Sequence, residues 1–110
     1  MEVVVETDDI MVMLECVKKD EPDLVIMEVG MHGIRNIDVI REITGMNRKT
    51  RFICMSMYAT EVMAREVFKA GAMGYLVKHR AFEELIAAIR CVMAGRTYSS
   101  IDFIEKPGVK

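Results

Sequence analysis

The stretch Leu24-Val25-Ile26-Met27-Glu28-Val29 ("LVIMEV") gives the strongest indication of how this chain folds. It is a nearly continuous apolar run, broken only by Glu28. Such runs are typical of strands in parallel sheets, because helices cover both faces of these sheets. The acid stands near the carboxyl end of the predicted strand. Open α/β sheets bind their ligands at that end, so Glu28 is a candidate functional residue.

On both sides of this run, short apolar segments alternate with amphipathic ones. Strands are predicted at 3–5, 24–29, 51–55 and 74–77, each followed by a helix. Helical crossovers between short strands predict right-handed βαβ units and a parallel sheet with helices on its faces. The sequence therefore predicts one α/β domain of about four strands and four helices.

Capping residues and apolar spacing define the predicted helices. The first begins at Asp8 or Asp9, the second at Asn36 and the third at Thr60, while the fourth runs from about 82 to 94. Gly71 and Gly95 are predicted to end the last two helices. The side chains expected to face the core are Ile37, Ile40 and Ile43 in the second helix, Val62, Val67 and Phe68 in the third, and Leu85, Ile86 and Ile89 in the fourth.

The bulk composition excludes several classes of protein. The 110 residues suffice for one domain, and 15 Lys and Arg residues nearly balance 17 Asp and Glu residues. This balance argues against a dedicated nucleic-acid or membrane-surface binder, and no apolar run is long enough to span a bilayer. The three cysteines form no CxxC pair, which indicates buried thiols in a reducing cytoplasm.

Several motifs resemble those of a known signalling family. Residues 22–29 ("PDLVIMEV") and the loop 30–33 ("GMHG") resemble the phospho-acceptor strand and following loop of response-regulator receiver domains. Three further stretches resemble the NarL/FixJ (LuxR-type) branch of this family: 54–58 ("CMSMY"), 70–78 ("AGAMGYLVK") and 83–90 ("EELIAAIR"). With the exit segment 94–99, the similarity covers residues 2 to about 100.

This resemblance implies a three-layer αβα flavodoxin-like fold, normally with five strands in the order 2-1-3-4-5. It also implies a cytoplasmic module of two-component signalling that receives phosphate from a histidine kinase. By position, Glu28 falls on the phospho-acceptor. Ser56 and Lys78 fall on the residues that bind the phosphoryl oxygens, and Tyr75 falls on the aromatic side chain that repacks between states.

The sequence departs from the family pattern in two places. The acceptor position holds Glu28 where the family has Asp. Only 18 residues separate Asp9 from Glu28, so residues 2–9 align with the second strand of the family and the turn after it. Asp8 and Asp9 then match turn residues and not the acid pair that holds Mg²⁺. We therefore expect a truncated receiver-like domain at 1–100, lacking its first strand and helix, and a tail or linker at 101–110.

Loss of the first strand would leave an open position in the sheet. An unpaired buried strand edge is costly, because its backbone groups lose their hydrogen bonds. The strand at 3–5 could pair directly with the strand at 24–29. Alternatively, a second copy or the tail segment 101–104 could fill the position. In either case apolar surface around the last helix is left uncovered, which predicts a homodimer or other oligomer, with strand exchange as one form.

The departures predict a loss of phosphorylation chemistry. Glu28 is one methylene longer than Asp, and Mg²⁺ would lack its acid pair, so we expect no aspartyl phosphorylation, no enzymatic activity and no cofactor. Three interpretations of Glu28 stay open. It mimics a phosphorylated Asp by reaching Ser56 and Lys78 with Tyr75 turned inward, it only pairs with Lys78, or it forms a metal site with Asp8 and Asp9.

The leading functional hypothesis is a degenerate receiver domain, or pseudo-receiver, that acts through protein–protein contacts. Its expected partner is a histidine kinase or another response regulator, with no direct binding to nucleic acid or membrane. One alternative is a fragment of a NarL/LuxR-type response regulator whose full-length parent is phosphorylated and regulates transcription. The last alternative is a metal-dependent enzyme that uses the acidic edge of the sheet.

Overall fold

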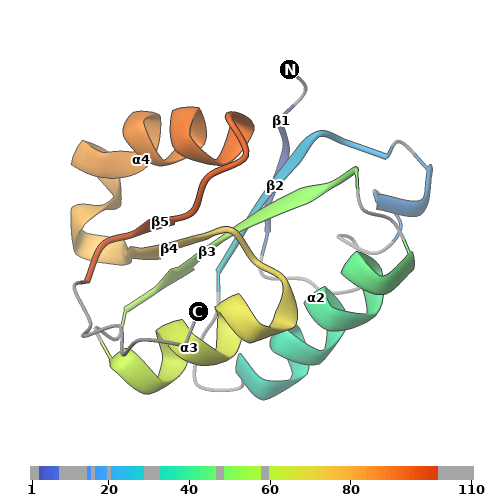
Figure 1. Ribbon diagram of the computed structural model, residues 1–110, viewed down its shortest axis with the longest axis horizontal. Coiled ribbons are helices and arrows are strands. Elements are labelled where there is room, and N and C mark those ends of the chain that lie inside the picture. Colours follow the sequence, from blue (N-terminus) through green and yellow to red (C-terminus); the bar gives the residue numbers. More distant parts are fainter. Residues whose placement is uncertain are drawn as a thin grey trace.

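A computed structural model of the chain describes residues 3–7, 15, 17–19, 21–28, 33–46, 49–57 and 60–101. The expectations for Asp8 and Asp9, and those for the tail after residue 101, lie outside these residues. A parallel sheet stands between two helical layers, as Figure 1 shows. Its strands are β1 (Val3–Thr7), β2 (Leu24–Glu28), β3 (Arg51–Ser56), β4 (Gly74–Val77) and β5 (Tyr98–Ser99). The helices are α2 (Gly33–Met46), α3 (Glu61–Ala70) and α4 (Lys78–Met93), and residues 15 and 17–19 are also helical.

The strand order is β1-β2-β3-β4-β5, and every neighbouring pair is parallel. β1 pairs directly with β2, with Val3 opposite Leu24 and Thr7 opposite Met27. Direct pairing is the first of the arrangements expected for a chain without the family's first strand. The backbone groups of β2 therefore have strand partners on both sides, β1 and β3.

The four predicted strands are all present, and a fifth short strand adds to them. β5 pairs with β4 through Gly74 opposite Tyr98 and Tyr75 opposite Ser99. It therefore extends the edge of the sheet opposite β1. This strand precedes the tail segment 101–104, where a strand was expected and of which only Ile101 is described. The backbone N–H of Tyr98 donates to the carbonyl of Met73, and that of Ser100 donates to the carbonyl of Tyr75, which holds this segment along β4.

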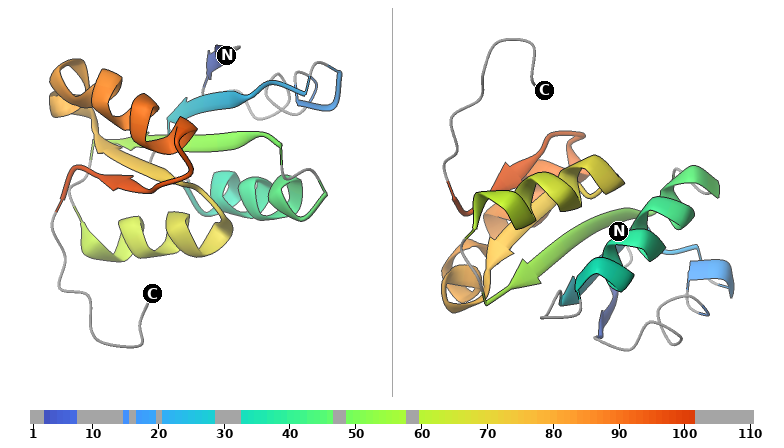
Figure 2. Two further views of the ribbon diagram at one scale, coloured as in Figure 1. Left: turned by 45° about the horizontal axis from the view of Figure 1, so that its top comes forward. Right: turned by 90° about the horizontal axis from the view of Figure 1, so that it is seen from below.

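The alternation of side chains along the strands divides the core between the two faces of the sheet. Figure 2 shows α2 and α3 on one side of the sheet and α4 on the other. The strand side chains that pack toward α2 and α3 are Val25, Met27, Phe52, Cys54, Tyr75 and Val77, and those that pack toward α4 are Leu24, Ile26, Ile53, Met55 and Leu76. All of them are buried, which is why the sequence shows continuous apolar runs.

The predicted ends of α3 are confirmed. The Thr60 side chain accepts a hydrogen bond from the backbone N–H of Met63, which satisfies an otherwise unpaired donor of the first turn. Gly71 follows the helix with a φ of 114°, a left-handed conformation that favours glycine. Its backbone N–H bonds back to the carbonyl of Phe68. Gly95 likewise has a positive φ, just beyond α4.

Two predicted helix starts were wrong. α2 begins at Gly33, so Asn36 lies within the helix and is not its cap. α4 begins at Lys78, directly after β4, because the chain turns from strand to helix without a loop. The expectation of a start near residue 82 overlooked this extra turn. None of the described helices has the length and apolar character needed to cross a bilayer.

Two predicted core positions were also wrong, Val62 and Ile86. The buried stripe of α3 is Ala64, Val67 and Ala70, so Val62 falls on the opposite side of the helix and is exposed. In α4 the buried stripe is Ala81, Ala88 and Val92, and Ile86 is exposed. Small alanines let α4 approach the sheet closely, and its larger apolar residues then lie toward the sides and the outside. The inward positions of Ile37, Ile40, Ile43 and Val67 are confirmed, and Phe68, Leu85 and Ile89 are partly buried against the core.

Candidate functional site

The carboxyl ends of β2, β3 and β4 bring three of the predicted site residues to one edge of the sheet. Glu28 is the last residue of β2, Ser56 is the last residue of β3, and Lys78 follows the last residue of β4. The register aligns Glu28 with Met55, and Ser56 with Val77. Because the strands are parallel, all three side chains stand at the edge where this class of sheet binds ligands.

Glu28 and Lys78 form an ion pair at this edge. Lys78 Nζ donates to Glu28 Oε2 at 2.7 Å, and the two side chains are 45% and 30% exposed, in that order. Since β3 lies between their strands, the pair spans two inter-strand spacings, roughly 10 Å of backbone separation. Two long side chains are needed to close that distance. Exposure to water limits the contribution of such a pair to about 0–1 kcal/mol.

Ser56 and Tyr75 form a buried pair below this edge. Both side chains are fully buried, and Tyr75 packs in the cluster that faces α2 and α3. Burial raises the pKa of Tyr75, while hydrogen bonds from the Ser56 side chain and the Thr60 backbone to its hydroxyl act in the opposite direction. The Tyr75 ring is thus turned inward, as the phosphate-mimic interpretation of Glu28 requires. The Ser56 hydroxyl is engaged with this tyrosine.

The metal-site interpretation of Glu28 involves Asp8 and Asp9, which lie outside the described residues. Within the part of the chain that is described, no three acidic, histidine or cysteine side chains are grouped closely enough to hold a metal ion. Glu28 pairs with the ammonium group of Lys78.

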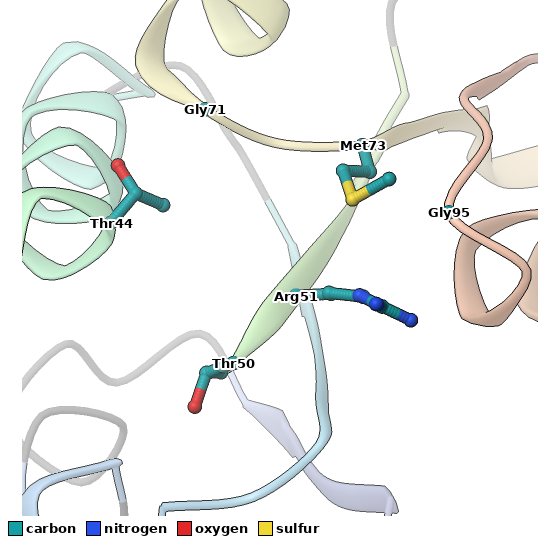
Figure 3. A pocket seen from close by; sticks show the side chains of 6 residues that line it. All are labelled: Thr44, Thr50, Arg51, Gly71, Met73 and Gly95. Atoms are coloured by element: carbon teal, nitrogen blue, oxygen red, sulfur yellow. The ribbon is translucent and has the colours of Figure 1, made fainter. Parts of the chain in front are cut away.

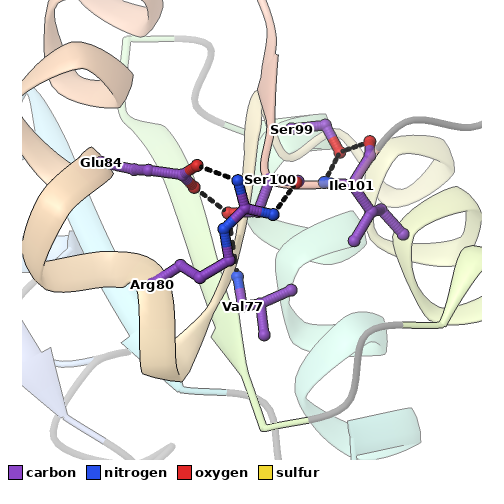
Figure 4. A network of polar contacts seen from close by, with 6 residues as sticks. All are labelled: Val77, Arg80, Glu84, Ser99, Ser100 and Ile101. Carbon is purple, nitrogen blue, oxygen red and sulfur yellow. Dashed lines mark hydrogen bonds and ion pairs between the residues drawn. The ribbon is translucent and has the colours of Figure 1, made fainter.

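A second polar cluster, which the sequence analysis did not find, lies next to Lys78. Figure 4 shows the buried Ser100 hydroxyl accepting from the backbone N–H of Val77 at 3.1 Å and bonding to the Glu84 carboxylate. Arg80 Nη1 donates to the Ser100 carbonyl at 2.8 Å, and Arg80 Nη2 pairs with Glu84 at 2.8 Å. The i, i+4 spacing of Arg80 and Glu84 was a visible signal in the sequence. No such signal in the sequence indicated the role of Ser100, because that role depends on the position of β5.

A hollow of the described surface lies away from Glu28, at the opposite edge of the sheet. Its volume is about 400 Å³, and its lining residues are Thr44, Thr50, Arg51, Gly71, Met73 and Gly95, labelled in Figure 3. Arg51 begins β3 and Met73 precedes β4, so the hollow lies at the amino edge of the sheet. Arg51 Nη1 donates to the carbonyls of Val92 and Met93 at 3.2 and 3.0 Å, which satisfies acceptors at the carboxyl end of α4. We assign Arg51 a structural role.

Known proteins resemble this chain in sequence. Residues 1–90 match the family described as the response regulator receiver domain. The transcription regulator BvgA of Bordetella pertussis is 30% identical over 97 residues, which are 88% of this chain and 46% of BvgA. The response regulator UvrY of Escherichia coli K12 is 31% identical over 84 residues, 76% of this chain and 38% of UvrY. The chain thus spans less than half of the length of these curated relatives.

Solved structures agree with the fold. A LuxR-family response regulator from Aurantimonas superposes with a TM-score of 0.76 and is 29% identical, over 86% of this chain and 68% of that one. The isolated receiver domain of RcsB from Salmonella enterica has a TM-score of 0.75 at 18% identity, over 87% and 71% of the two chains, which shows the fold alone. Together with the match over residues 1–90, these likenesses confirm the expected receiver fold, and the chain belongs to the response regulator receiver domain family, with LuxR/NarL-type regulators among its relatives.

Proposed function

We propose that this receiver domain is a pseudo-receiver: it signals by binding another protein and does not accept a phosphoryl group at Glu28. The observation that carries this proposal is the 2.7 Å contact between Glu28 Oε2 and Lys78 Nζ at the acceptor position. The proposed partner is a histidine kinase or another response regulator, in the cytoplasm. On this proposal the domain is a signalling module and not an enzyme.

Phosphoryl transfer depends on positioning and on stabilising charge, since the acceptor oxygen must attack in line with the leaving group. Glu28 carries an extra methylene, and its carboxylate bonds to the lysine that the family resemblance assigns to the phosphoryl oxygens. A negative charge therefore stands beside Lys78 without any phosphorylation. Tyr75 is buried below it, in the inward position. These features support a domain held in one signalling state, with Glu28 replacing a phosphorylated Asp.

A phosphodonor experiment tests this proposal. The chain is incubated with acetyl phosphate and Mg²⁺, and intact mass is measured against a receiver domain that has Asp at the acceptor position. We expect the control domain to gain a phosphoryl group and this chain to gain none. A Glu28→Asp variant is treated in the same way. Phosphorylation of the unaltered chain at Glu28 would overturn the proposal.

The second candidate function is that of a piece of a longer response regulator. The observation that favours it is length, because the matched residues make up 46% of BvgA and 38% of UvrY. On this hypothesis the full-length parent is phosphorylated and regulates transcription. Labelling of the Glu28→Asp variant by acetyl phosphate would favour it. The sequence of the transcript on both sides of this segment tests it directly, and an open reading frame that continues into a DNA-binding domain is the supporting result.

A further inference from the structure

The hollow at the amino edge of the sheet lies where three helices end, as Figure 3 shows. Thr44 is in the last turn of α2, Gly71 follows α3, and Gly95 lies just beyond α4. Arg51 begins β3, and Met73 precedes β4. The volume of about 400 Å³ falls within the range of roughly 300–1,000 Å³ that is usual for small-molecule sites. We call this cavity the amino-edge hollow.

Arg51 is the charged residue among those that line the amino-edge hollow, and it is half-buried. Figure 3 shows its side chain extending from the start of β3 toward Gly95. Its hydrogen bonds to the last carbonyls of α4 both come from Nη1. Within the described part of the chain, Nε and Nη2 have no hydrogen-bond partner, and no carboxylate pairs with the guanidinium.

The unused edge of Arg51 indicates the chemistry of a ligand. Nε and Nη2 are two parallel donors on one side of a planar group, and two oxygens of one carboxylate fit them side by side. A half-buried guanidinium without a counter-ion also favours an anion over a neutral or cationic molecule. The geometry of the donors and their charge therefore favour the same class of ligand.

The helix ends around the hollow limit how much negative charge it can accept. The carboxyl end of a helix carries a partial negative charge, which opposes a nearby anion. Here the carbonyl of Ala70 accepts from the Thr44 hydroxyl at 3.0 Å, and two carbonyls of α4 accept from Arg51. These bonds reduce the opposition and do not reverse it. A single negative charge is therefore favoured over the two of a phosphate, and the half-buried Met73 offers an apolar contact beside it.

We propose that the amino-edge hollow binds a small organic monocarboxylate. The two carboxylate oxygens accept from Nε and Nη2 of Arg51, and the apolar part of the ligand contacts Met73. Nη1 keeps its bonds to α4, so the structural role of Arg51 continues when the ligand is bound. The pair of Glu28 and Lys78 lies at the opposite edge of the sheet, so this inference stands apart from the proposed function.

Titration of the isotopically labelled chain with sodium butyrate, followed by NMR, tests the proposal. We expect saturable shifts of the backbone amides that line the hollow and of the Arg51 Nε–H. The probe is small, so its dissociation constant should lie in roughly the millimolar range. Butyramide has nearly the same shape without the charge and should give no saturable shifts. Inorganic phosphate at mildly alkaline pH is mostly a dianion and should bind more weakly than butyrate.

A pair of variants tests the role of the guanidinium. Arg51→Lys keeps a positive charge that can bond to the carbonyls of α4, but it lacks the two parallel donors. It should weaken butyrate binding about tenfold or more. Arg65→Lys is the matched control, because it makes the same substitution in the first half of α3, where Arg65 pairs with Glu61 outside the hollow. It should leave the affinity unchanged, and circular dichroism verifies that both variants are folded.

Several results would overturn the proposal. One is the absence of saturable shifts with butyrate over the whole millimolar range. Others are equal shifts with butyramide, tighter binding of phosphate, or an Arg51→Lys chain that binds butyrate as well as the Arg65→Lys control does. The comparison of butyrate, butyramide and phosphate uses the unaltered chain, so it decides the question even if Arg51→Lys does not fold.

Discussion

The two faces of the sheet are covered to different extents. On one face α2 and α3 lie side by side, and the large side chains Phe52 and Tyr75 are completely buried beneath them. On the other face α4 approaches the sheet through Ala81 and Ala88 and leaves Phe82 bare to solvent. The first face completes its core within the chain. The second leaves part of its apolar surface, Phe82 and Ile86, exposed among the described residues.

The largest expected change in the free energy of unfolding comes from a comparison of two phenylalanines, one from each face of the sheet. Phe52→Ala removes a fully buried ring and should lower the free energy of unfolding by about 3–5 kcal/mol, because a cavity remains under α2 and α3. Phe82→Ala removes an exposed ring and should change the free energy of unfolding of the monomer by less than about 0.5 kcal/mol. Urea denaturation at low protein concentration measures both. Equal losses would show that α4 is packed differently from the arrangement described.

The second prediction concerns Cys54, on the face covered by α2 and α3. Burial raises the pKa of its thiol from 9.0 to about 12. Above pH 9 the unfolded chain releases this proton while the folded chain keeps it, so alkali favours unfolding. The contribution of the protonated Cys54 thiol to the free energy of unfolding is fully present below pH 9. It should fall by about 1.4 kcal/mol per pH unit between pH 9 and 12.

Cys54→Ala provides the control for this pH effect. The difference in the free energy of unfolding between the unaltered chain and the variant isolates the thiol from lysines and other groups that titrate in the same range. We expect that difference to shrink steadily as the pH rises from 9. A difference that stays constant up to pH 11 would mean that the thiol is accessible to water in the folded protein.

The elements of the fold that follow from periodicity were predicted correctly. Continuous apolar runs located the strands, and Thr60 and Gly71 marked the ends of α3, because caps and positive φ angles are local properties. The exposure of Val62 and Ile86 was not predicted. A 3.6-residue pattern shows that a helix has an apolar side, but the width of the surface beneath it decides which residues are covered.

The candidate site also contains one contact that the sequence predicts and one that it does not. The contact between Glu28 and Lys78 was predictable from the sequence. Both residues lie at the carboxyl ends of strands, and parallel strands bring these ends to one edge of the sheet. The hydrogen bonds of Ser100 were not predictable, since they depend on a two-residue strand, β5, whose pairing with β4 is a tertiary contact. Short strands carry too few residues for a periodic signal.

The third prediction compares two glycines, one after a helix on each face. At Gly71 the φ is 114°, and an added Cβ would come within 2.7 Å of Thr44 Oγ1 on α2. Gly71→Ala should therefore cost about 2–3 kcal/mol, from backbone strain and from displacement of Thr44. At Gly95, after α4, the φ is 85° and nothing lies within 4 Å, so Gly95→Ala should cost about 1–2 kcal/mol. Thermal unfolding compares the two variants. A smaller cost at Gly71 would contradict the tight contact between α2 and the end of α3.

The smallest effect is expected at Ser100, which ties the end of the α4 side to the sheet. Its hydroxyl accepts from the buried N–H of Val77 and bonds to Glu84, so Ser100→Ala leaves a backbone donor unsatisfied. We expect a loss of about 1–2 kcal/mol. Ser99→Ala is the matched control, because its hydroxyl bonds only locally, to Ile101, within the described contacts.

Hydrogen exchange at Val77 separates a specific effect from a general one. Ser100→Ala should speed exchange of the Val77 amide more than exchange of amides in β3, whereas Ser99→Ala should leave the ratio unchanged. If exchange rises equally in both strands, Ser100 stabilises the whole domain and does not anchor β5 in particular. In the expected outcome Ser100 adds a local polar anchor for β5 at the edge of a face whose buried apolar cluster, like that of the opposite face, supplies most of the stability.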